Sequence, residues 1–100
     1  MDWHYVNPGR GGWTGYTWNR SLFPNPAQFL QYLKGKTLHV TLNLHPAGVI
    51  EPNEERYKDM ANWMVMDPSS KQRIDYCGSD KRFMSGWLNT ILRPMEIEGV

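Results

Sequence analysis

Residues 36–46 (KTLHVTLNLHP) constrain the fold most, because polar and apolar side chains alternate strictly from Thr37 to Leu44. Alternation with a period of two, in a run with β-branched residues, predicts a β-strand over residues 37–44. In α/β folds, the chemistry gathers at the carboxyl ends of the strands. We therefore expect a functional edge at the end of this strand, where the chain carries Asn43, His45 and Pro46.

The neighbouring segments favour an α/β arrangement. Residues 2–6 are typical of the end of a second strand, and three stretches have the spacing of amphipathic helices. These helices are predicted at residues 26–34, 53–64 and 80–93. A strand that follows a helix after a short link is typical of a βαβ unit, so we expect the two strands to be parallel.

The first helix has clear signals at both ends. Asn25 is a good N-cap, Pro26 suits the first helical position, and Gln28 stands where a capping-box partner is found. Gly35 is expected to end this helix as a C-terminal glycine. Pro94 is expected to end the last helix.

The second helix is predicted to bury Tyr57, Met60, Ala61 and Met64, which fall on one helical face. The carboxylates near its start suit the positive end of the helix dipole. We interpret them as solvated charges of the first turn, not as general acids. They are Glu51, Glu54 and Glu55.

Residues 7–23 combine four glycines with several aromatic residues and are predicted to form a long loop. Long loops of this kind are often binding loops. Two interpretations stay open for Trp13, Tyr16 and Trp18: they pin the loop onto a core, or they line a ligand site.

Composition excludes several classes of function. The formal net charge of +1 gives no electrostatic case for binding nucleic acid or an anionic membrane. Cys77 is the single cysteine, the first residues lack the pattern of a signal peptide, and no apolar run has the length of a membrane span. We expect a cytoplasmic protein. The spacing of the three histidines matches no metal site, and no cofactor motif is present, so neither a metal nor a cofactor is expected.

Three segments together resemble the catalytic barrel of glycoside hydrolase family 31, especially its α-glucosidase-like members. They are DWHY, GWTGYTWNRSLFPNPAQFLQYL and LHVTLNLHPAGVIEPNEERY, and the resemblance continues to the end of the chain. It implies a partial (β/α)₈ barrel, truncated at both ends, in one domain over residues 1–100. A complete barrel of this type needs about 250 residues.

The resemblance also implies which residues face the sugar. Asp2 matches the second Asp of the family's Asp-x-Asp motif, and the first would precede Met1. The expected substrate-binding residues, at the ends of the two barrel strands and in the aromatic loop, are Asp2, Trp3, His4, Trp13, Trp18, Asn43 and His45.

Retaining glycosidases need two carboxyl groups about 5–5.5 Å apart, one as nucleophile and one as acid/base. The resemblance implies that both would follow Val100, so no residue of this chain is assigned a catalytic role. We expect part of a retaining α-glycosidase that is inactive alone. Its expected partners are a carbohydrate substrate and, through the exposed barrel edges, other copies of itself. The alternative is a non-enzymatic α/β module that binds carbohydrate through its aromatic residues.

Overall fold

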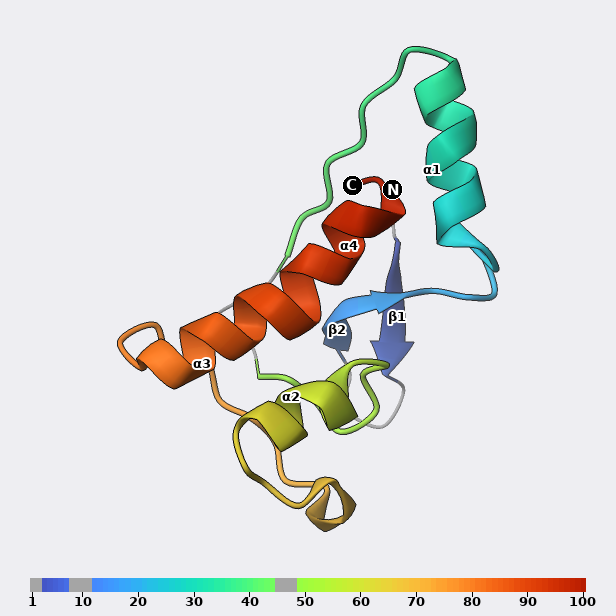
Figure 1. Ribbon diagram of the computed structural model, residues 1–100. Helices are drawn as coiled ribbons and strands as arrows, with labels where there is room; N and C mark the ends of the chain where they lie inside the picture. The colour runs from blue at the N-terminus through green and yellow to red at the C-terminus, as the bar shows by residue number, and fades with distance from the viewer. Residues whose placement is uncertain (1–2, 8–11, 45–48) are drawn as a thin grey trace.

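The computed structural model describes residues 3–7, 12–44 and 49–100. Within these residues, the sheet is a two-stranded antiparallel hairpin of β1 (His4–Asn7) and β2 (Gly12–Trp18). Figure 1 shows this hairpin between α1 and the shorter helices of the second half of the chain. The described residues therefore form no parallel barrel.

The hairpin corrects two predictions. The aromatic segment that was predicted to be a loop contains β2, and the strand predicted at residues 2–6 lies at 4–7 and pairs with β2. Tryptophan, tyrosine and threonine favour a pleated, half-buried backbone, and in β2 this preference outweighs the two glycines. Tyr16 and Trp18 are almost completely buried, so β2 supplies a large part of the core.

The prediction of a strand at residues 37–44 is also wrong. The structure gives residues 38–44 an extended course without strand pairing to any described residue. Val40, Leu42 and Leu44 nevertheless pack against the core, whereas Thr41 and Asn43 are exposed. The alternation thus predicted the correct face for the side chains of residues 39–44, whereas the apolar Leu38 is 54% exposed. A ladder also needs a neighbouring strand, and β1 pairs with β2 instead.

Helix α1 (Pro26–Gly35) confirms the helix predicted at residues 26–34. Asn25 caps it, because its side-chain oxygen accepts a hydrogen bond from the backbone N–H of Gln28 at 3.1 Å. Pro26 occupies the first turn, where its missing N–H leaves no intrahelical bond unmade. The apolar face of α1 buries Leu30 against the core.

The C-terminal end of α1 differs from the prediction that Gly35 would be the stop. Gly35 is the last helical residue, and Thr37 takes the left-handed conformation, with a φ of 61°. The N–H of Thr37 donates to the carbonyl of Lys34, and the N–H of Leu38 donates to that of Leu33. This pair of bonds is a Schellman motif, which satisfies the last carbonyls of the helix.

Helix α2 (Tyr57–Trp63) begins four residues later than the predicted start at residue 53 and ends one residue before the predicted end at 64. Residues 52–56 form turns instead. The predicted apolar face is confirmed, since Tyr57, Met60 and Ala61 are buried. A short 3₁₀ helix, η1 (Pro68–Ser70), follows.

The last helix is longer than the predicted range of residues 80–93. It runs through α3 (Lys81–Gly86), a π-helical segment η2 (Trp87–Leu92) and α4 (Arg93–Glu98). Asp80 caps its start by accepting hydrogen bonds from two backbone N–H groups. Pro94, which was expected to end the helix, lies in the first turn of α4. The π-helical turn directly before α4 already interrupts the regular α-helical hydrogen-bond ladder, so the helix can continue through a residue that lacks the N–H.

Two clusters of buried side chains form the core. One gathers residues of β2, α2, α3 and η2 around Met60 and Phe83. The other joins Trp3 and Trp18 to Leu30 of α1 and Met95 of α4. Leu44, in the extended segment, packs against both clusters. None of the described helices has the length and apolar character needed to cross a lipid bilayer.

Candidate functional site

Trp3 and Asn43 lie next to each other although 40 positions separate them in the sequence. The indole N–H of Trp3 donates to the side-chain oxygen of Asn43 at 3.1 Å. The Trp3 ring also makes an edge-to-face contact with the Trp18 ring, with 5.2 Å between their centroids. The structure therefore brings together three of the seven residues that the sequence predicts to bind substrate.

These three residues differ in their access to solvent. Trp3 and Trp18 are 1% and 2% exposed, whereas Asn43 is exposed. A ligand at this position would meet the Asn43 amide, with the two indoles behind it as support. The indole N–H of Trp18 is buried and has no hydrogen-bond partner among the described residues.

The other predicted residues are placed less fully. Asp2 and His45 lie outside the described residues. His4 belongs to β1 and is paired with Trp18 in the ladder, and Trp13 belongs to β2 and is paired with Val6. Their contact with a substrate remains a prediction.

Glu54 is a buried carboxylate that sequence reasoning missed. It is 4% exposed, and its side-chain oxygens accept hydrogen bonds from the Gly15 N–H, at 2.8 Å, and from the Thr17 hydroxyl. Thr17 in turn accepts a hydrogen bond from the Glu55 N–H at 3.2 Å. Glu54 therefore fastens the turn before α2 to β2, which corrects its interpretation as a solvated charge. The apolar face of α2, continued one turn backwards from Tyr57, reaches Glu54, and this was the available signal.

Burial raises the pKa of the Glu54 carboxyl above its ordinary value. The hydrogen bonds from Thr17 and Gly15 act in the opposite direction, because they favour the ionised form. Since both of its oxygens are bonded to β2, Glu54 connects two parts of the fold.

Glu55 makes a surface ion pair with Arg20. The Nε and Nη2 atoms of Arg20 each donate to one oxygen of Glu55, both at 2.8 Å. This two-point contact lowers the pKa of Glu55. The pair borders a cavity of about 240 Å³. The prediction of a charged, accessible side chain is correct for Glu55.

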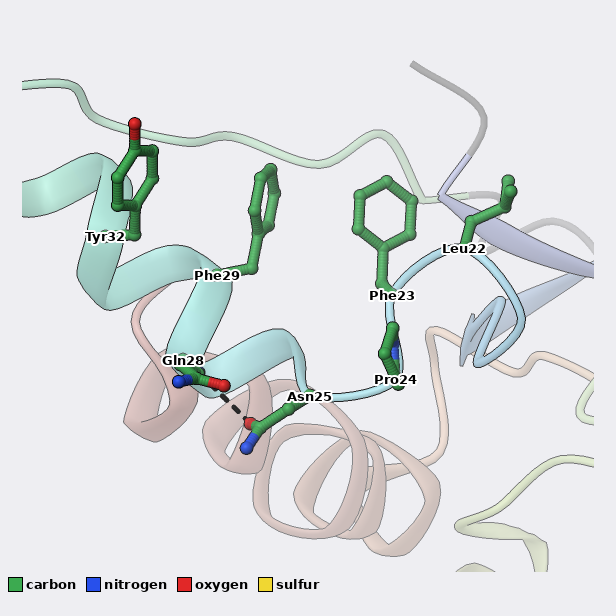
Figure 2. A pocket seen from close by; sticks show the side chains of 7 residues that line it. All are labelled: Leu22, Phe23, Pro24, Asn25, Gln28, Phe29 and Tyr32. Carbon is green, nitrogen blue, oxygen red and sulfur yellow. Dashed lines mark hydrogen bonds between the residues drawn. The ribbon is translucent and has the colours of Figure 1, made fainter.

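A larger groove of about 460 Å³ lies where the chain enters α1. Figure 2 shows the rings of Phe23, Phe29 and Tyr32 in a row, with the amides of Asn25 and Gln28 at one side. The centroids of the Phe23 and Phe29 rings are 5.1 Å apart, and Tyr32 is 63% exposed. Aromatic faces beside amide groups form a surface suited to a sugar ring. The sequence analysis did not single out this groove.

Among the described residues, no three His, Cys, Asp or Glu side chains are grouped to hold a metal ion. The candidate places for binding a ligand are the Trp3–Asn43 contact, the cavity beside the Arg20–Glu55 pair and the groove beside α1.

Comparison with models of protein families gives a match that covers almost the whole chain. The family model described as "Glycosyl hydrolases family 31 TIM-barrel domain" matches residues 1–94, and no curated protein matches the chain. The matched range includes every residue that the sequence predicts to bind substrate. With 94 of its 100 residues covered, the chain belongs to glycosyl hydrolase family 31.

Proposed function

We propose that this chain supplies scaffold and one wall of the sugar pocket to a retaining α-glycosidase of the α-glucosidase type. The observation that carries the proposal is the family match over residues 1–94. The contact between Trp3 and Asn43 supports it, because two residues expected at the ends of neighbouring barrel strands meet in space. In this proposal the substrate is an α-linked glucoside or a related sugar.

The proposal assigns binding to this chain, and not bond cleavage. Retaining hydrolysis needs one carboxylate that attacks the anomeric carbon and a second that protonates the leaving oxygen, about 5–5.5 Å apart. No residue of this chain matches either of the family's catalytic positions. Glu54, the one buried carboxylate among the described residues, is held by hydrogen bonds to β2.

An assay on an aryl α-glucoside tests this division of roles. We expect the purified chain to release no more aryl alcohol than a buffer blank, because neither catalytic carboxylate is present. Hydrolysis that co-purifies with the chain through several columns would contradict the proposal.

Binding can be measured separately by titration calorimetry with maltose. We expect Asn43→Ala to weaken binding, because the exposed amide at the Trp3 contact is removed. Asn62→Ala is the matched control, since Asn62 is an exposed asparagine on α2. Equal affinities in the two variants would exclude Asn43 from the pocket.

The groove beside α1 favours a second candidate, a carbohydrate-binding module without enzymatic activity. Here the sugar would stack on Phe29 and Tyr32, which line the groove, whereas Asn43 does not line it. Tyr32→Ala would then abolish maltose binding, whereas Asn43→Ala would leave it unchanged. The reverse pattern supports the first candidate.

A further inference from the structure

Strand β2 is held by two sets of hydrogen bonds. One set is the ladder with β1, in which His4 is paired with Trp18. In the other set, the side chain of Glu54 accepts hydrogen bonds from the Gly15 N–H, at 2.8 Å, and from the Thr17 hydroxyl. Figure 1 shows β2 beside the turns that lead into α2. Because a two-stranded hairpin alone is marginally stable in water, the bonds from Glu54 help to fix the position of β2.

Glu55 extends this connection to the residues that follow β2. Its N–H donates to the Thr17 hydroxyl at 3.2 Å, and its carboxylate accepts two hydrogen bonds from Arg20, both at 2.8 Å. Arg20 and Glu55 are exposed, whereas Glu54 is 4% exposed. Losing a buried acceptor costs more than losing an exposed one, because the donors that it served are left without partners. Glu54 is therefore the point at which a substitution should loosen β2 most.

Strand β2 connects Glu54 to Trp3. Thr17 contacts Glu54, and the next residue, Trp18, packs edge-to-face on the Trp3 ring with 5.2 Å between the centroids. The N–H of Asn19 also donates to the carbonyl of Trp3 at 2.6 Å. Trp3 is thus held at its ring and at its backbone by the two residues that follow Thr17.

We propose that Glu54 is a positioning residue for the contact between Trp3 and Asn43. The Glu54 carboxylate fixes Thr17, and it thereby holds Trp18 where its ring supports Trp3. The indole N–H of Trp3 then donates to the side-chain oxygen of Asn43 at 3.1 Å and orients this exposed amide. That the oriented amide meets a sugar rests on the proposed function, whereas the effect of Glu54 on the contact does not.

Hydrogen exchange at the indole N–H groups, followed by NMR, tests the positioning without any sugar. The indole N–H of Trp63 is the internal reference, because it donates to the Arg82 carbonyl, away from β2. Glu54→Met keeps the length of the side chain and removes both acceptor oxygens. We expect exchange at Trp3 to become about tenfold faster, the effect of losing a buried hydrogen-bond acceptor, and exchange at Trp63 to stay unchanged.

Two further variants are matched controls. Glu54→Gln keeps one acceptor oxygen and adds an amide that can donate to the Thr17 hydroxyl, so exchange at Trp3 should stay close to that of the wild type. Glu98→Met removes a carboxylate that is paired with Arg56 at 3.3 Å, and it should leave the ratio of the two exchange rates unchanged. If circular dichroism shows that Glu54→Met is unfolded, Thr17→Val removes the same hydrogen bond from the strand and should accelerate exchange at Trp3.

The exchange rates can contradict the proposal in two ways. An unchanged rate at Trp3 in the folded Glu54→Met or Thr17→Val chain would overturn it. Equal acceleration at Trp3 and Trp63 would also overturn it, because the substitution would then lower the stability of the whole chain without a specific effect on the contact.

Calorimetry with maltose connects the positioning to the proposed function. Glu54→Met should raise the Kd by about tenfold, and it should have no further effect in an Asn43→Ala background, because Glu54 acts through that amide. Equal weakening in both backgrounds would overturn this route. A wild type that binds no maltose would contradict the proposed function, and the exchange at Trp3 would still decide the role of Glu54. Normal maltose binding with unchanged exchange in Glu54→Met would overturn the role of Glu54 and leave the proposed function intact.

Discussion

Glu54 places a carboxyl group in the interior, between β2 and the turn that leads into α2. Its pKa is raised in the folded chain, chiefly because burial penalises the charged form. A raised folded pKa means that the folded state binds the proton more tightly than the unfolded state does. The resulting stabilisation is complete below the ordinary pKa of 4.5 and is lost as the pH rises through the folded value.

Replacing Glu54 by glutamine should remove this pH dependence. Urea unfolding of the wild type and of Glu54→Gln, measured from pH 4 upward, gives the difference in their free energies of unfolding. We expect this difference to change in favour of the variant as the pH rises above about 4.5, because the wild type must then keep a buried charge.

The pKa of Glu55 is shifted in the direction opposite to that of Glu54, so Glu55 provides a control. Arg20 lowers its pKa, so the stabilisation from Glu55 is present at neutral pH and is lost as the pH falls through the lowered value. The difference between the wild type and Glu55→Gln should therefore favour the wild type more as the pH rises. A Glu54→Gln series with the same sign as the Glu55→Gln series would refute the assignment of Glu54.

The helix from Lys81 to Glu98 shows how an element accommodates irregular residues. Its central π-helical turn, η2, is wider than an α-helical turn. The carbonyls of Ser85 and Gly86 accept hydrogen bonds from the side chains of Asn89 and Thr90, both at 2.7 Å. Gly86, at the start of this turn, lies against Trp63 of α2. A side chain at Gly86 would meet the Trp63 ring, so glycine sets how closely α2 and α3 approach.

Replacing Gly35 or Gly86 by alanine should therefore have opposite effects on the stability of the chain. In α1, a Cβ at Gly35 would meet nothing within 4 Å, so Gly35→Ala should stabilise the chain by about 0.5–1 kcal/mol. In α3, a Cβ at Gly86 would lie 2.5 Å from a Trp63 ring atom, so Gly86→Ala should destabilise it by about 1–3 kcal/mol. Thermal unfolding of both variants measures the two effects. Stabilisation by both would show that α2 and α3 are not closely packed at Gly86.

On the scale of the whole molecule, the two core clusters meet at Leu44. One cluster is built around α2 and α3, and the other around Trp3 and α1. The isolated β-bridge between Ile50 and Ile74 joins the segment before α2 to the segment after η1, with N···O distances of 2.8 and 3.1 Å. Leu44 is thus a point at which a single side chain couples both halves of the interior.

Leu44→Ala should destabilise the chain by roughly 1–3 kcal/mol, because it removes apolar contacts from both clusters. Leu22→Ala is the control, and it should change stability by less than about 0.5 kcal/mol, because Leu22 is 62% exposed. Chemical unfolding followed by tryptophan fluorescence measures both. Equal losses of stability in the two variants would mean that Leu44 does not join the clusters.

Local signals predicted the helices well and the sheet poorly. The cap at Asn25 and the apolar face of α2 depend on neighbours within one or two turns, so sequence spacing suffices to find them. The pairing of β1 with β2 is a choice between partners, and spacing alone does not show that choice. The left-handed Thr37 was missed for a related reason, because Gly35 is the stronger local candidate for a helix stop.

The candidate site shows the same contrast between features set by local sequence and features set by distant contacts. Spacing and resemblance singled out Trp3, Trp18 and Asn43, and the fold brings these three together. The burial of Trp3 and Trp18, the role of Glu54 and the aromatic groove beside α1 depend on which surfaces cover which side chains. These surfaces come from distant segments, so a one-dimensional pattern does not contain them.

By itself, the sequence determined the family, through its motifs, and it determined the places of the helices and the faces of residues 39–44, through local spacing and residue type. Only the tertiary structure decided that β1 pairs with β2, that Glu54 is buried and that residues 38–44 belong to no strand of the described part of the chain. The physical reason is that hydrogen-bond pairing and desolvation are properties of two surfaces in contact, and the second surface is chosen only when the chain folds.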